Sequence, residues 1–248
     1  MNDLTTSFVR RLRERDPQAW FELWETFGPV LRSQLHRWGR GRIGQETVQD
    51  LSQETLAALA TAIDRHDPSK GARFSTWLLA IARYPLGDEM DRRNALKRGA
   101  GVKPRSLEDE FNAPSPEAGP GESYEAEIFE AKVAAALRQV ERECDFMEFS
   151  VYRMRVLDGL TGRKVAEDLG ISPPTVSRRL AGVRQKLRGK LQEVFSKYSF
   201  TEEEMQELAR NGLDLNPTKE DEASFDEAVA EIYHRICARE SGTARADS

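Results

Sequence analysis

The stretch between residues 157 and 191 has the pattern of a helix-turn-helix, and it constrains the fold more than any other part of the sequence. Thr161 can cap a short helix, because its hydroxyl can accept a hydrogen bond from a first-turn amide. Gly170 can end that helix, since glycine tolerates a left-handed C-terminal cap. Ser172 and Pro173 then suit the start of a second helix. This order predicts two helices joined by a tight turn, the second of which enters the major groove of DNA.

The second predicted helix carries positive charge only. Residues 173–192 contain no acidic residue and six basic ones, Arg178, Arg179, Arg184, Lys186, Arg188 and Lys190. A basic face opposite an apolar stripe is what neutralisation of DNA phosphates requires, whereas a solvated helix in a bundle normally carries both signs. We therefore expect this helix to bind DNA.

The composition limits which kinds of protein this chain can be. The net charge of the 248 residues is −5, so affinity for nucleic acid has to come from local patches. Cys144 and Cys237 are far apart and lie on apolar helical positions, which predicts buried thiols and no metal site or cofactor. No apolar run approaches the roughly 18 residues of a membrane span, and no signal peptide is apparent. We expect a cytoplasmic protein without membrane insertion.

The N-terminal part has helical periodicity throughout. Residues 6–15 and a longer stretch after Pro17 carry apolar stripes typical of core packing. In residues 48–63 an apolar stripe faces inward and leaves three polar residues on the opposite face, Asp50, Gln53 and Glu54. Residues 73–93 carry another core stripe, and we expect Pro85 to bend or interrupt this helix because it lacks an amide hydrogen.

The sequence predicts an all-α fold, because no segment alternates β-branched and polar residues as a strand does. Residues 99–123 are rich in glycine and proline and have no periodicity, which predicts a flexible linker. The expected organisation is therefore two helical domains and a C-terminal extension, with boundaries 5–98, 99–123 for the linker, 124–196 and 197–248.

The C-terminal extension is acidic and contains two capping-box patterns, Thr201-x-x-Glu204 and Ser224-x-x-Glu227. They predict helices near 202–211 and 225–239. Residues 201–231 hold eleven carboxylates and two basic residues. Two interpretations are open: a solvated helical tail, or an acidic element that docks on a basic surface or a protein partner.

Taken together, three ordered motifs resemble bacterial sigma factors of the extracytoplasmic-function (ECF) type. DLSQETL at 50–56 resembles the region 2 helix that binds the coiled coil of the polymerase β′ subunit. FSTWLLAIAR at 74–83, with the residues that follow it, resembles the helix that holds the melted minus-ten element. The helix-turn-helix resembles the region 4 element that reads the minus-thirty-five element. The resemblance covers about residues 5–195.

The resemblance implies a role for three groups of residues. Core RNA polymerase would contact Asp50, Gln53 and Glu54. The non-template strand of the minus-ten element would contact Tyr84, Asp88, Arg92 and Arg93. The minus-thirty-five element would contact Thr175, Ser177, Arg178, Arg179, Arg184 and Lys186. An anti-sigma factor or another regulator is a further implied partner.

The chain departs from the family at three places, the last of which is the extension after Lys197, which goes beyond the minimal family. Tyr84 stands where asparagine is common, so the minus-ten preference does not transfer. Arg163 and Lys164 replace what is often an acidic pair, which should strengthen phosphate contact but could weaken a contact with polymerase or an activator.

The expected function is that of a promoter-specificity subunit of RNA polymerase. The alternative is a stand-alone helix-turn-helix regulator with an N-terminal oligomerisation domain, which would have no need of the motifs at 50–56 and 74–93. An enzyme is not expected, because the sequence has no phosphate-binding glycine loop or nucleophile motif and its three histidines are scattered.

Overall fold

The computed structural model describes residues 3–39, 43–65, 72–98, 122–213 and 219–246, and within these ranges every regular element is a helix. The prediction of an all-α chain is confirmed there. Contacts between residues divide the chain into two compact units, Met1–Ile128 and Phe129–Ser248, which are described one at a time. The linker predicted at 99–123 lies almost wholly outside the described residues.

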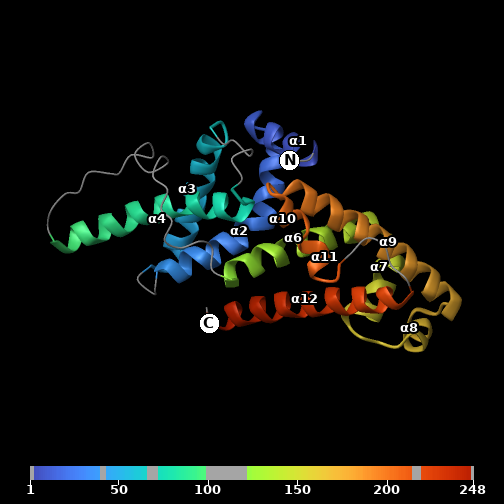
Figure 1. Ribbon diagram of the computed structural model, residues 1–248. Coiled ribbons are helices and arrows are strands. Elements are labelled where there is room, and N and C mark those ends of the chain that lie inside the picture. The colour runs from blue at the N-terminus through green and yellow to red at the C-terminus, as the bar shows by residue number, and fades with distance from the viewer. Residues whose placement is uncertain (1–2, 40–42, 66–71, 99–121, 214–218, 247–248) are drawn as a thin grey trace. The chain divides into compact units, whose positions relative to one another are not determined.

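The described residues of the first unit form α1 (Asp3–Arg13), α2 (Pro17–Gly39), α3 (Gln45–Ala62) and α4 (Phe74–Arg98), together with the first residues of α6 (Glu122–Glu143). Helices α2, α3 and α4 pack against one another, and α1 packs on α2 (Figure 1). The expected second domain begins at 124, whereas residues 124–128 group with this first unit.

Aromatic and aliphatic side chains fill the core of the first unit. The ring centroids of Phe27 and Phe74 are 4.8 Å apart, and Trp77 lies 5.8 Å from Phe74. A second group of buried side chains lies between α2, α3 and α4, and it consists of Leu35, Ile43, Val48, Leu51 and Leu86. The inward stripe predicted for residues 48–63 is thus confirmed. This packing turns the polar face of α3 to solvent.

Pro85 does not interrupt its helix, because α4 runs unbroken from Phe74 to Arg98. The proline removes one backbone hydrogen bond. The next residue, Leu86, is buried in the cluster between the helices, and Met90 packs against the same cluster one turn later. Tertiary packing therefore holds the helix on the C-terminal side of the proline.

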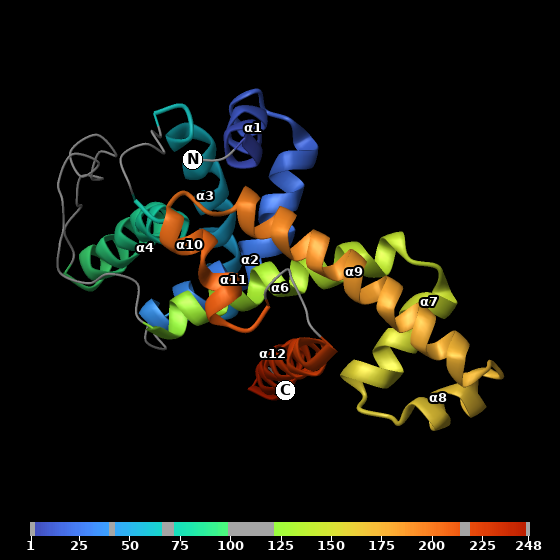
Figure 2. The ribbon, with the colours of Figure 1, turned by 45° about the vertical axis from the view of Figure 1, so that its right-hand side comes forward.

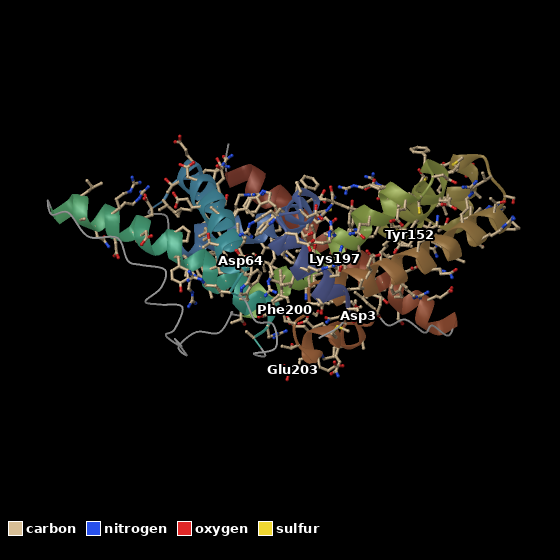
Figure 3. All side chains as sticks on the ribbon, turned by 90° about the horizontal axis from the view of Figure 1, so that it is seen from above. Asp3, Asp64, Tyr152, Lys197, Phe200 and Glu203 are labelled. Carbon is tan, nitrogen blue, oxygen red and sulfur yellow. The ribbon has the colours of Figure 1, made fainter. Side chains whose placement is uncertain are left out.

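The second unit contains the rest of α6 and a series of helices: α7 (Phe146–Tyr152), the π-helical segment η2 (Arg153–Leu157), α8 (Gly162–Leu169), α9 (Pro173–Lys197), α10 (Glu202–Met205), α11 (Glu207–Arg210) and α12 (Lys219–Ala246). Figure 2 shows that α8 leads directly into α9, and that α10 follows the opposite end of α9. Tyr152, labelled in Figure 3, is fully buried where α7 packs on α9.

The caps predicted at Thr161, Gly170 and Ser172 are confirmed at the ends of α8 and α9. The Thr161 hydroxyl accepts a hydrogen bond from the amide of Lys164, and Gly170 ends α8 with φ +62°. The Ser172 hydroxyl accepts from the amide of Thr175 and caps α9. α8 and α9 are therefore two capped helices joined by a short turn, and local sequence specifies both caps.

Two expectations for the rest of this unit are wrong. Ser224 does not begin a helix, because α12 begins at Lys219 and Ser224 lies inside it. The helix predicted at 225–239 is present within α12, where Phe225, Val229 and Ile232 are buried, and it begins six residues earlier than expected. Cys144 and Cys237 are partly exposed rather than buried. The capping box at Thr201 is confirmed.

No described helix is long and apolar enough to cross a membrane.

Candidate nucleic-acid interfaces

The exposed side of α3 carries the three residues predicted to contact polymerase. Asp50, Gln53 and Glu54 are all exposed, while Leu51 and Thr55 on the opposite side are buried. We call these three exposed residues the α3 polar face. Two carboxylates and an amide on one rigid helix can give register and orientation to a basic partner.

The second half of α4 presents a different kind of surface. Tyr84, Asp88 and Arg92 recur every four residues, so they share one side of the helix. Asp88 and Arg92 are exposed and Tyr84 is half-buried. An aromatic ring beside a cation is the combination that single-stranded nucleic acid binds, by base stacking and by neutralisation of phosphate.

Arg93 lies next to this side of α4 and is held in a network. Its Nε donates to Oε1 of Glu89 at 2.5 Å, and its Nη2 donates to Oγ1 of Thr47 on α3 at 3.0 Å. Arg92 donates from Nε to the other oxygen, Oε2 of Glu89, at 2.8 Å. Burial alone would raise the pKa of Glu89, but the hydrogen bonds from Arg93 and Arg92 outweigh burial and lower it.

The N-terminal turns of α9 are the most open part of the predicted recognition surface. Ser177 and Arg178 are exposed, and Thr175 is half-buried. The Thr175 hydroxyl lies 2.9 Å from that of Ser172, and the Ser177 hydroxyl donates to the carbonyl of Pro173 at 3.3 Å. Arg178 has no ion-pair partner among the described residues, so its guanidinium can reach a base edge or a phosphate.

Arg179 and Lys186 brace α9 against α7 instead. Arg179 Nη1 lies 3.3 Å from Oδ1 of Asp145, the N-cap of α7, and Lys186 Nζ lies 2.7 Å from Oε2 of Glu148. The hydrogen bond from Lys186 lowers the pKa of Glu148. These ion pairs hold α9 on α7, and both cations still lie at the protein surface.

Arg184 is turned away from the open surface. Its guanidinium pairs with Asp226 and Glu222 of α12, at 2.5 Å and 2.8 Å, and its side chain is only 14% exposed. One turn further along α9, the Arg188 guanidinium carbon lies 4.2 Å from the ring centroid of Phe225. The six predicted contacts to the minus-thirty-five element are thus divided between an open N-terminal turn, a brace on α7 and a pairing with α12.

In the C-terminal half of α12, basic side chains pair with an acidic side chain of α6. This is the reverse of its N-terminal half, where acidic side chains pair with a basic side chain of α9. Arg235 donates from Nε to Oε1 of Glu130 at 2.9 Å, and Arg239 pairs with the other oxygen of the same carboxylate. His234 Nε2 lies 2.8 Å from the carbonyl of Leu157 at the end of η2. Helix α12 therefore has acids facing α9 and bases facing α6.

Sequence reasoning missed Glu89, Glu222, Asp226 and Glu130 as partners of the arginines. The acidic character of residues 201–231 next to a basic α9 was the available signal, but it did not identify which pairs form. No group of three or more histidine, cysteine or acidic side chains in the described part of the chain could hold a metal ion.

Comparison with protein-family models gives one finding. Residues 23–95, less than a third of the chain, match the model of sigma-70 region 2. The matched segment runs from α2 to α4 and contains the α3 polar face, Tyr84, Asp88, Arg92 and Arg93. No curated protein matches the chain.

The match supports the prediction that the chain is a sigma-70 family factor. That family consists of non-enzymatic transcription initiation factors, so the match also supports the expectation that this chain is not an enzyme. Helices α8 and α9, where the sequence predicts a helix-turn-helix, lie outside the matched residues.

Proposed function

We propose that the protein is a sigma factor of the ECF type that binds core RNA polymerase and directs promoter-specific transcription initiation. The observation that carries the proposal is the region 2 match at 23–95 followed, in the second unit, by the two capped helices α8 and α9, which we interpret as a helix-turn-helix. The ECF assignment rests on the order of the three motifs. The proposed site of action is the cytoplasm, and an anti-sigma factor is a proposed regulator.

In this proposal the α3 polar face contacts the β′ coiled coil of polymerase. Its side chains are exposed on a helix whose other side is buried in the core, so they are rigidly placed. Such pre-organisation lowers the entropic cost of association. The acidic character of the face favours a basic partner.

The two DNA elements are assigned to two different surfaces. Tyr84, Asp88 and Arg92 would hold the non-template strand of the minus-ten element, with Arg93 beside them. The N-terminal turns of α9 would read the minus-thirty-five element, and Arg178 is the side chain best placed to reach a guanine edge.

We also propose that α12 regulates the helix-turn-helix. Arg184 cannot neutralise a DNA phosphate while it is paired with Asp226 and Glu222. DNA and α12 therefore compete for the same guanidinium. Of the two interpretations of the acidic extension, these ion pairs favour the one in which it docks on a basic surface.

Co-purification with core RNA polymerase tests the main proposal. The full-length protein should form a complex, and the triple variant Asp50→Ala/Gln53→Ala/Glu54→Ala should bind much more weakly because it removes the α3 polar face. Glu14→Ala is the matched control, since Glu14 is an exposed acid of the same unit outside the matched segment.

If the full-length protein does not bind core RNA polymerase, two explanations are possible, and a truncated chain distinguishes them. A chain ending at Leu213 lacks α12 and keeps α10 and α11. Binding by that chain alone would mean that α12 masks the polymerase contact. No binding by either chain would favour a stand-alone helix-turn-helix regulator.

A further inference from the structure

One carboxylate of α4, that of Glu89, holds both arginines of the proposed strand-binding surface. Oε1 accepts from Arg93 at 2.5 Å, and Oε2 accepts from Arg92, whose Nε is at 2.8 Å and whose Nη2 is at 2.6 Å. The Glu89 side chain is only 7% exposed, whereas that of Arg92 is 71% exposed. The acid thus lies beneath the cations, and the exposed arginine faces solvent.

This arrangement is unusual for a surface that binds a polyanion. A carboxylate beside two arginines cancels one of their two charges and would repel a phosphate at close range. Electrostatics alone therefore predicts that Glu89 weakens the binding of DNA. A compensating benefit has to come from geometry.

The geometry supplies that benefit. An unrestrained arginine loses side-chain rotamer entropy when it is fixed on a ligand. Glu89 fixes the guanidiniums of Arg92 and Arg93 before any strand arrives. The Thr47 hydroxyl of α3 accepts from Arg93 Nη2 at 3.0 Å and adds a second anchor, so that arginine is held between two helices.

We propose that Glu89 is a positioning residue that orients Arg92 and Arg93 for the phosphates of single-stranded DNA. The inference rests on the proposed function of this α4 surface in capturing the non-template strand. Glu89 itself would not touch the strand, since it lies beneath the arginines and acts through them.

The positioning role is tested by whether neutralising Glu89 lowers or raises the affinity for single-stranded DNA. The measurement is the affinity of the full-length protein, bound to core polymerase, for a fluorescent single-stranded oligonucleotide carrying the non-template minus-ten sequence. Glu89→Gln keeps the size of the side chain and removes its charge. If positioning dominates, affinity falls about 3- to 10-fold although the surface has become more positive.

Asp91→Asn is the matched charge control. Asp91 is on the same turn of α4, is half-buried, and pairs with neither arginine in the part of the chain that the structure describes. Removing its charge should leave affinity unchanged or raise it slightly. Glu89→Asp, which keeps the charge on a shorter side chain, should recover part of the loss.

The outcomes separate this inference from the function on which it rests. If Arg92→Ala/Arg93→Ala weakens strand binding while Glu89→Gln leaves it equal or tighter, the positioning role is wrong and the strand-binding surface stands. If the arginine double variant binds as tightly as wild type, the strand-binding assignment itself fails. A further loss from Glu89→Gln in the double-alanine background would also overturn the inference, because Glu89 should act only through the arginines.

A second variant tests whether Glu89 acts by positioning the arginines or only by stabilising the fold. Thr47→Val removes the other anchor of Arg93 without altering charge, and it should lower affinity less than Glu89→Gln does. If Glu89→Gln does not fold, Thr47→Val decides the question: unchanged strand affinity in that variant would overturn the positioning role.

Discussion

Arg184 on the predicted recognition helix and Asp226 on α12 form a two-point ion pair. Nη2 of Arg184 lies 2.5 Å from Oδ2 of Asp226, and Nε lies 3.0 Å from Oδ1. This fork-to-carboxylate geometry is the strongest form of arginine pairing. Both side chains are mostly shielded from solvent, at 14% and 17% exposed. The pair therefore holds the acidic extension on a cation that we propose as a DNA contact of α9.

Asp226→Asn should raise the affinity of the protein for duplex minus-thirty-five DNA by roughly 3- to 10-fold. The amide cannot hold the arginine by charge, so Arg184 becomes available to a phosphate. Fluorescence anisotropy with labelled duplex measures the affinity. The salt dependence should steepen as well, because one more phosphate is neutralised on binding.

Glu227→Gln is the control for that experiment. Glu227 is adjacent in the sequence and exposed, and it has no ion-pair partner within the described chain. Glu227→Gln changes the net charge by the same amount as Asp226→Asn but leaves the ion pair between Arg184 and Asp226 intact. Equal gains in affinity for the two variants would show that net charge, and not the pairing with Arg184, governs the effect.

Arg178→Ala should weaken duplex binding by about 1–3 kcal/mol and relax sequence preference if Arg178 reads a base. Arg179→Ala should lower affinity for all sequences, because its pairing with Asp145 fixes the position of α9. Binding titrations against the cognate duplex and against single-base variants distinguish the two results. Unchanged affinity and an unchanged salt slope for both variants would remove the recognition role of this turn.

Two glycines of the helix-turn-helix should respond to alanine with opposite signs. Gly170 has φ +62° and open space around its missing Cβ, so Gly170→Ala should destabilise the second unit by about 1 kcal/mol through backbone strain alone. Gly189 lies inside α9, also with open space, so Gly189→Ala should stabilise it by roughly 0.5–1 kcal/mol. Calorimetric unfolding measures both. A stabilising Gly170→Ala would contradict the left-handed cap.

Local signals explain which parts of the structure could be predicted from sequence. The caps at Thr161, Gly170 and Ser172 depend on hydrogen bonds within three or four residues, so a short window contains all the information. The buried stripe of α3 likewise follows from helical periodicity. The α3 polar face was found as the complement of that stripe.

The failures involve tertiary contacts. Ser224-x-x-Glu227 has the same pattern as the correct box at Thr201, but it lies inside α12, which begins at Lys219. The pairing of Arg184 with Asp226 joins residues 42 apart in the sequence. A capping pattern or a charge count cannot specify such pairs, because they depend on how α12 packs.

The stability of the first unit should depend on pH through Glu89. Its folded-state pKa is lowered from the ordinary value of 4.5, so its stabilising contribution is complete above that value and is lost as the pH falls through the lower folded pKa. Wild type should therefore exceed Glu89→Gln in free energy of unfolding by about 1 kcal/mol at pH 7, and the difference should shrink as the pH falls below 4.5. Urea unfolding followed by tryptophan fluorescence isolates this unit, because all four tryptophans lie within residues 1–128. A difference that is constant from pH 7 to pH 3 would mean that Glu89 stabilises the unit without its charge.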